Sequence, residues 1–158
     1  MWCVHPVYRT ADRESIRIDR EATLAAPVTA APDRVGVLVV DDSAESRAAI
    51  GKVVVHTPGF ELVGSVASGE EALDAVSRLD PELVLLDVRM PGLSGPETSR
   101  LIRAGGARSV VVLVSALRRP ELPDSVEECG AAAILHKCEL SPRRLVALWQ
   151  EAGVLARL

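Results

Sequence analysis

Four short apolar runs, each ending in charged or hydroxyl-bearing residues, constrain the fold of this chain more than any other feature. The runs occupy residues 37–42, 83–87, 110–115 and 133–137. Their length and their content of Val, Leu and Ile are typical of buried parallel strands, which read as nearly continuous apolar stretches. Ligands of open parallel sheets bind outside the carboxyl ends of the strands. We therefore expect three carboxylates, one hydroxyl and one ammonium group to meet at one edge of a sheet.

Strand and helix patterns alternate from residue 35 onward, which predicts an α/β fold. Serines at positions 43 and 68 are suited to cap helices, and prolines and glycines separate the elements. Strands are expected at residues 35–40, 60–66, 83–86, 110–114 and 132–135. Helices are expected at 44–55, from Ser68 to Asp80, from Gly95 to Gly105, at about 123–129 and from Ser141 to about 152. Such units imply a doubly wound, five-stranded parallel sheet covered by helices on both faces.

Composition narrows the class of protein. Hydrophobic residues make up 48% of 158 residues, enough for the core of one domain. The net charge of −4 comes without a basic stripe, which argues against direct binding to nucleic acid. No apolar run approaches the ~18 residues of a membrane span. Three cysteines, Cys3, Cys129 and Cys138, lack metal-ligand spacing and are expected as reduced thiols of a cytoplasmic protein.

The first 34 residues differ in character from the rest of the chain. They mix Arg, Asp, Glu, Thr, Ala and Pro without a clear period, and two Ala-Ala-Pro sequences, ending at Pro27 and Pro32, would interrupt any helix. We therefore expect residues 1–34 to be a flexible extension and residues 35–158 to form the domain.

The charged residues at the strand ends occur within recognisable motifs. These motifs are the pair Asp41-Asp42, the string Leu86-Asp87-Val-Arg-Met-Pro-Gly-Leu-Ser-Gly95, the pair Ser115-Ala116, and Gly130-Ala131 followed by Lys137. In order and spacing, residues 35 to 150 resemble the receiver domain of two-component response regulators. The resemblance implies a flavodoxin-like (βα)5 fold with strand order 2-1-3-4-5.

The resemblance also implies a phosphorylation site that depends on Mg²⁺. Asp87 would accept the phosphoryl group, in keeping with the ability of a carboxylate to form an acyl phosphate. Asp42, Asp87 and the backbone carbonyl of Arg89 would bind the metal directly, while Asp41 would bind it or orient a water. Lys137 and Ser115 would contact phosphoryl oxygens.

The implied function is that of a stand-alone receiver, a signalling switch that catalyses only its own phosphorylation and dephosphorylation. Its phosphodonor would be a histidine kinase or a histidine phosphotransfer protein. An unknown protein target could bind the face formed by the expected helix at 123–129, the strand at 132–135 and the last helix. Charged residues of this face are Glu127, Glu128, Arg143 and Arg144, and they could equally be ordinary solvated charges.

Two other functions remain open. A phosphatase or phosphotransferase of the haloacid dehalogenase type also uses a strand-end aspartate, but it needs a second acid where this chain has Arg89. A degenerate receiver could act as a phosphorylation-independent scaffold, although the acidic set is complete. None of the three histidines, His5, His56 and His136, is expected to carry a phosphoryl group.

The chain departs from the receiver pattern at two positions. Ile134 occupies the position of the usual aromatic switch residue, which is expected to work with Ser115. Cys138 follows the lysine, where many receivers have a proline. These changes leave the phosphorylation set intact but predict a modified switch.

Overall fold

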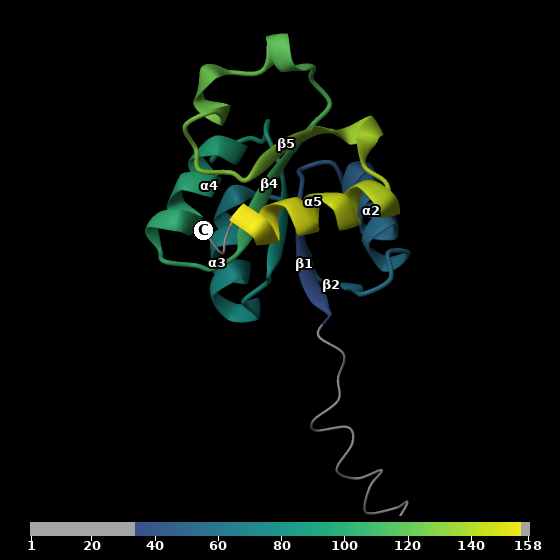
Figure 1. The fold of residues 1–158 in the computed structure, drawn as a ribbon. Coiled ribbons are helices and arrows are strands. Elements are labelled where there is room, and N and C mark those ends of the chain that lie inside the picture. Colours follow the sequence, from purple (N-terminus) through teal and green to yellow (C-terminus); the bar gives the residue numbers. More distant parts are fainter. Residues whose placement is uncertain (1–33, 156–158) are drawn as a thin grey trace, which may run out of the picture. The chain divides into compact units, whose positions relative to one another are not determined.

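The computed structural model describes residues 34–155 (Figure 1). The predicted flexible extension therefore lies, apart from Arg34, outside the described residues, and so does Cys3. None of the helices within the described range has both the length and the apolar character needed to cross a membrane.

A five-stranded parallel sheet with the order β2-β1-β3-β4-β5 forms the centre of the domain, as predicted. Each strand lies within one residue of its predicted bounds. The strands are β1 (Val35–Val40), β2 (Phe60–Val66), β3 (Leu83–Asp87), β4 (Val110–Ser115) and β5 (Ala133–His136). Because all strands run in the same direction, their carboxyl ends share one edge of the sheet.

Four α-helices connect or follow the strands, and serine side chains cap three of them. The helices are α2 (Ala44–Val55), α3 (Gly69–Leu79), α4 (Gly95–Ala104) and α5 (Pro142–Leu155). Ser43, Ser68 and Ser94 each accept a hydrogen bond from a backbone N–H of the first turn. These caps satisfy donors that a helix leaves free at its start.

The strand residues alternate between two cores, one on each face of the sheet. Leu38, Leu86 and Leu113 pack on the side that α3 and α4 cover, together with Ala72 and Ile102. The neighbouring strand residues Val37, Val39, Leu85, Val112 and Val114 face the other way. They pack with Ile50 and Val54 of α2 and with Leu145 and Leu148 of α5. Figure 1 shows α2 and α5 on one side of the sheet and α3 and α4 on the other. Burial on both faces explains the continuous apolar runs.

The predicted helix at 123–129 is wrong. Between β4 and β5 the described chain forms two short 3₁₀ turns, Arg119–Glu121 and Asp124–Val126. Two prolines that lack an N–H break this segment, at positions 120 and 123. Tertiary contacts then hold its end as a loop, because Cys129 is buried and its carbonyl accepts a hydrogen bond from Ser99 Oγ at 3.0 Å.

Candidate functional site

The sheet brings five predicted site residues to its carboxyl edge. Asp41 and Asp42 directly follow β1, Asp87 and Ser115 are the last residues of β3 and β4, and Lys137 directly follows β5. Asp41, Asp87 and Ser115 are buried, whereas Asp42 is exposed. The site therefore has a buried floor and an acidic residue at its rim.

Asp41 is the most firmly held of the three carboxylates. Its side chain accepts hydrogen bonds from Ser43 N–H at 2.9 Å and from Ser46 Oγ at 2.5 Å. Arg47 donates to the backbone carbonyl of Asp41 at 2.7 Å. These three partners belong to the cap and first turn of α2, so the start of this helix fixes the orientation of Asp41.

Lys137 links β5 to the acidic residues of the other strands. Its Nζ lies 2.6 Å from Asp41 Oδ2 and 3.3 Å from Asp87 Oδ1. The lysine side chain is 24% exposed, so its ammonium group reaches inward from the rim to two nearly buried carboxylates. Removing such an ammonium group would leave buried negative charge without its partner.

The electrostatics of the site favour a cation. Burial is the largest cause that raises the pKa of Asp87 to about 6, and the charge of Asp41 raises it further, against the opposing effect of Lys137. Burial lowers the pKa of Lys137, but the hydrogen bond to Asp41 and the charges of Asp87 and Asp41 outweigh it, so the pKa is raised. Ionised Asp87 is therefore short of positive charge even with Lys137 beside it.

The three carboxylates fit a magnesium ion. Asp41, Asp42 and Asp87 each offer one oxygen, and these oxygens lie within 4.8 Å of one another. Carboxylate oxygens are the protein ligands that Mg²⁺ takes, usually one or two of them with several waters. Arg89, the predicted source of a carbonyl ligand, lies in the loop that follows Asp87.

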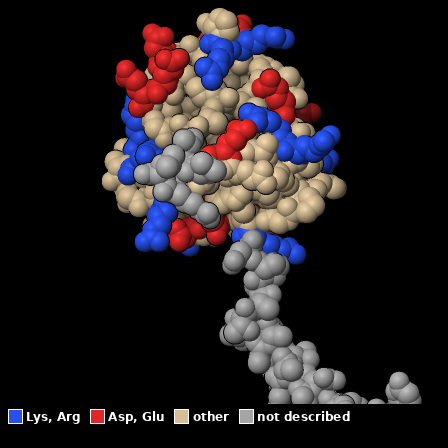
Figure 2. All heavy atoms as spheres, in the orientation of Figure 1, with Lys and Arg blue, Asp and Glu red and all other residues tan. Residues whose placement is uncertain are grey.

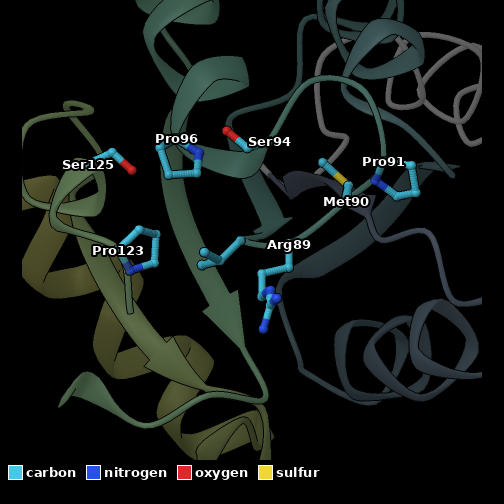
Figure 3. A pocket seen from close by; sticks show the side chains of 8 residues that line it. Arg89, Met90, Pro91, Ser94, Pro96, Pro123 and Ser125 are labelled. Carbon is cyan, nitrogen blue, oxygen red and sulfur yellow. The ribbon is translucent and has the colours of Figure 1, made fainter. Parts of the chain in front are cut away.

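The start of α4 approaches the backbone at the end of β3 through a glycine. A Cβ on Gly95 would lie only 2.2 Å from the carbonyl oxygen of Asp87, so no larger residue fits there without moving the backbone. Gly95 N–H also donates to the carbonyl of Val88 at 2.9 Å. The Arg89 side chain is exposed and lines a cavity of about 540 Å³ that Pro96 and Pro123 border from other segments (Figure 3).

The two predicted switch residues lie at different depths. Ser115 is 2% exposed, and its hydroxyl accepts a hydrogen bond from Leu117 N–H at 3.0 Å. Ile134 is only partly buried and packs against the core on the α3 and α4 side. The structure thus places a hydroxyl at the site edge and an aliphatic side chain on the neighbouring strand.

Sequence reasoning missed the groups that support Asp41. The predicted cap at Ser43 indicated where α2 begins, but nothing in the sequence assigned Ser46 or Arg47 to the site. The direct contact between Lys137 and Asp41 was also missed, because these residues lie 96 positions apart. A helix that starts two residues after an acidic pair was the available signal, since its first turn must lie beside that pair.

Comparison with known proteins agrees with this fold. Residues 37–150 match the response regulator receiver domain family. A protein-glutamate methylesterase/protein-glutamine glutaminase of Myxococcus xanthus is 37% identical over 131 residues, which are 77% of this chain and 38% of that protein. Response regulator GacA of Pseudomonas viridiflava is 36% identical over 101 residues, which are 64% of this chain and 47% of that protein.

Solved structures give the same result. The response regulator domain of Thermotoga maritima CheB superimposes with a TM-score of 0.67 at 27% identity, covering 76% of this chain and 97% of that chain. The receiver domain of Mycobacterium tuberculosis NarL has a TM-score of 0.67 at 28% identity, covering 74% of this chain and 98% of that chain. The chain belongs to the family of response regulator receiver domains. It spans less than half the length of the curated relatives it matches.

Proposed function

We propose that this protein is a phosphorylation-driven switch in which Asp87 accepts a phosphoryl group in a Mg²⁺-dependent reaction. The observation that carries the proposal is the meeting of Asp87 with two further carboxylates and with Lys137 at one edge of the sheet. A carboxylate can attack phosphorus to form an acyl phosphate. Phosphoryl transfer otherwise requires alignment and neutralisation of the charge on the phosphoryl oxygens.

Each residue of the site has a distinct part in this proposal. Asp41, Asp42, Asp87 and the carbonyl of Arg89 would hold Mg²⁺, which supplies positive charge to the phosphoryl oxygens when bound. Lys137 would supply a second positive charge from the end of β5 and would exchange its carboxylate contacts for a phosphoryl oxygen. The hydroxyl of Ser115 would exchange Leu117 N–H for another phosphoryl oxygen.

The donor in this proposal is a histidine kinase or a histidine phosphotransfer protein, and the output is altered binding of a protein target. The protein would catalyse only reactions of its own phosphoryl group. That the protein resides in the cytoplasm stays a prediction. The target surface would lie on β5, on α5 and on the segment between β4 and β5 that contains the two 3₁₀ turns. This segment carries Glu127 and Glu128, and α5 carries Arg143 and Arg144. That the protein does not bind nucleic acid directly also stays a prediction. Figure 2 shows acidic and basic side chains interspersed on the face in view.

Incubation with a small phosphodonor such as acetyl phosphate, followed by intact mass measurement, tests the proposal. We expect wild type to gain one phosphoryl group with Mg²⁺ and none with a chelator. Asp87→Asn keeps the shape of the side chain but removes the nucleophile, so it should not be labelled. Asp74→Asn, at an exposed position on α3, is the matched control and should be labelled like wild type.

The result also distinguishes a phosphorylation-driven switch from a scaffold that works without phosphorylation. Equal labelling of wild type and Asp87→Asn would sink the assignment of Asp87. No labelling of wild type by either a small phosphodonor or a histidine phosphotransfer protein would favour the scaffold function, in which partner binding does not depend on phosphorylation.

A further inference from the structure

A cysteine and a histidine contact each other just outside the acidic site. The ring of His136, the last residue of β5, lies with Nδ1 2.8 Å from Cys138 Sγ. On its other side, Nε2 lies 3.0 Å from the backbone carbonyl oxygen of Ala116, which follows β4. The imidazole therefore joins an exposed thiol to the loop that directly follows Ser115.

The contacts determine which nitrogen carries the proton. A carbonyl oxygen only accepts hydrogen bonds, so Nε2 must donate to Ala116. The backbone N–H of Cys138 points to Nδ1 at 3.2 Å, which requires Nδ1 to be an acceptor. The neutral ring with its proton on Nε2 satisfies both contacts. The electron pair on Nδ1 that accepts from Cys138 N–H also lies within reach of the Cys138 thiol.

This arrangement has the three parts of an activated nucleophile. A nucleophile within hydrogen-bond reach of a base, with the base oriented by a third group, is the general signature of covalent catalysis. Here the thiol is the nucleophile, His136 is the base and the Ala116 carbonyl orients the ring. The other cysteine within residues 34–155, Cys129, is buried and donates to the carbonyl of Val126, so it lacks such a base.

Space and charge beside the thiol indicate the reagent. His136 and Cys138 line a cavity of about 540 Å³ together with Arg118, Arg119 and Glu139, so two guanidinium groups stand against one carboxylate. Both arginines are exposed and neither forms an ion pair within the described part of the chain. Two guanidinium groups beside an open cavity favour a small molecule with carboxylate groups.

We propose that Cys138 is a modification site that reacts with small, anionic disulfides of the glutathione type. In the reaction Cys138 Sγ attacks one sulfur of the disulfide while its proton passes to His136 Nδ1. A new bond forms between Sγ and that sulfur, the original S–S bond breaks, and the leaving thiolate takes the proton from His136. The products are a mixed disulfide on Cys138 and one free small thiol, so that the disulfide is the only oxidant consumed.

The adduct would reach the phosphorylation site through the adjacent residue, a step that rests on the proposed function. Cys138 follows Lys137 in the same 3₁₀ turn, Lys137–Glu139. A bulky anionic group on Cys138 would compete with the carboxylates for Lys137 and would displace the ring that holds Ala116. We expect the mixed disulfide to slow phosphorylation of Asp87, so that the thiol couples redox state to signalling.

Mass spectrometry of the full chain treated with oxidised glutathione tests the proposed site. Trypsin separates the three cysteines, since Cys3, Cys129 and Cys138 fall in peptides 1–9, 119–137 and 138–143. We expect Cys138 to be modified while Cys129 stays free. In the folded protein Cys138 should react at least about tenfold faster than in denaturant, because the base is positioned only in the fold.

Two variants separate a chemical role of His136 from a structural one. His136→Gln keeps a side-chain N–H that can reach Ala116 but removes the base, whereas His136→Ala removes both. We expect both variants to lose the acceleration, and His136→Gln to keep the melting temperature of wild type. Acceleration that survives in His136→Gln, or equal rates in folded and denatured wild type, would overturn the proposal.

A separate measurement tests the coupling. Acetyl phosphate labelling of Asp87 should be slower in the glutathionylated protein and normal in treated Cys138→Ser. If neither form is labelled, the phosphorylation proposal fails and the thiol site stands. If both are labelled equally fast, the coupling between Cys138 and Asp87 is absent.

Discussion

At the scale of single residues, Asp87 is placed where its charge is costly. Its pKa of about 6 in the folded protein exceeds the ordinary value of 3.8 that applies to the unfolded chain. Between these values the folded protein holds a proton that the unfolded chain has released. Stability must therefore fall as the pH rises through this window, and the cost is complete above about pH 6. Because ionised Asp87 lowers the stability of the folded protein, a cation bound beside it should raise that stability.

The first prediction concerns this cost. Asp87→Asn removes the charge, so at about pH 7 and in the presence of a chelator it should increase the free energy of unfolding by about 1 to 3 kcal/mol. Near pH 4 the gain should shrink, because Asp87 of the folded wild type is then protonated. Urea unfolding at both pH values measures the difference, with Asp74→Asn as the surface control. Destabilisation by Asp87→Asn at both pH values would contradict the burial argument.

The second prediction concerns Lys137, whose ammonium group faces the fully buried carboxylate of Asp41. Lys137→Met keeps the aliphatic stem and removes the charge, and should reduce the free energy of unfolding by about 2 to 4 kcal/mol. Lys52→Met changes the chain's other lysine, which is exposed, and should cost less than about 0.5 kcal/mol. Chemical denaturation of the two variants without metal gives the comparison.

Magnesium provides a check on the same pair. A divalent cation at the carboxylates would supply part of the missing positive charge, so Mg²⁺ should raise the melting temperature of Lys137→Met more than that of wild type. An equal shift in both proteins would show that Lys137 and the metal do not act on the same charges.

At the scale of secondary structure, the elements with strong sequence signals were predicted and the weakly specified one was not. The strands were identifiable because their buried runs are continuous. The starts of α2 and α3 were marked by serine caps, and α4 was marked by a Gly-Pro pair at its start and a glycine pair at its end. The segment between β4 and β5 has no comparable pattern. Its prolines at 120 and 123 and the buried Cys129 favour 3₁₀ turns, and the burial of Cys129 depends on α4, which is distant in sequence.

The third prediction is that this segment carries the response to phosphorylation. All of its backbone hydrogen bonds between Arg118 and Glu127 are of the short 3₁₀ type, so its opening should cost less than that of α4. Ile134 has a stiff, β-branched side chain that can stay partly buried in both states, and it should discriminate little between them. Hydrogen exchange with and without beryllofluoride and Mg²⁺ should therefore show modest changes confined to residues 116–131.

The comparison with Ile134→Ala tests the role assigned to this side chain. Large protection changes that extend over β5 and α5 and persist in Ile134→Ala would show that the coupling runs through other residues. Unchanged exchange throughout the domain would show that the phosphoryl mimic has no preferred state to stabilise.

At the scale of the whole molecule, the sheet explains why the site was predictable in its parts but not in its contacts. Parallel strands put Asp42, Asp87, Ser115 and Lys137 at one edge whatever their loops do, so the strand pattern alone brings them together. Which of them touch depends on side-chain directions that no local pattern encodes. The 2.6 Å contact of Lys137 with Asp41, in place of a symmetric pairing with Asp87, is such a case.

The fourth prediction concerns the first 33 residues, whose contribution to the domain follows from their composition. The first 33 residues contain two Ala-Ala-Pro breaks and nine charged residues of both signs, a composition poorly suited to burying a core of its own. A shortened chain that begins at Asp33 should therefore keep its melting temperature within a few degrees and its labelling at Asp87 by acetyl phosphate. Thermal unfolding and intact mass measure the two properties side by side with the full chain.

A large drop in melting temperature would mean that the N-terminal residues pack on the domain. Loss of labelling with unchanged stability would mean that they take part in phosphorylation.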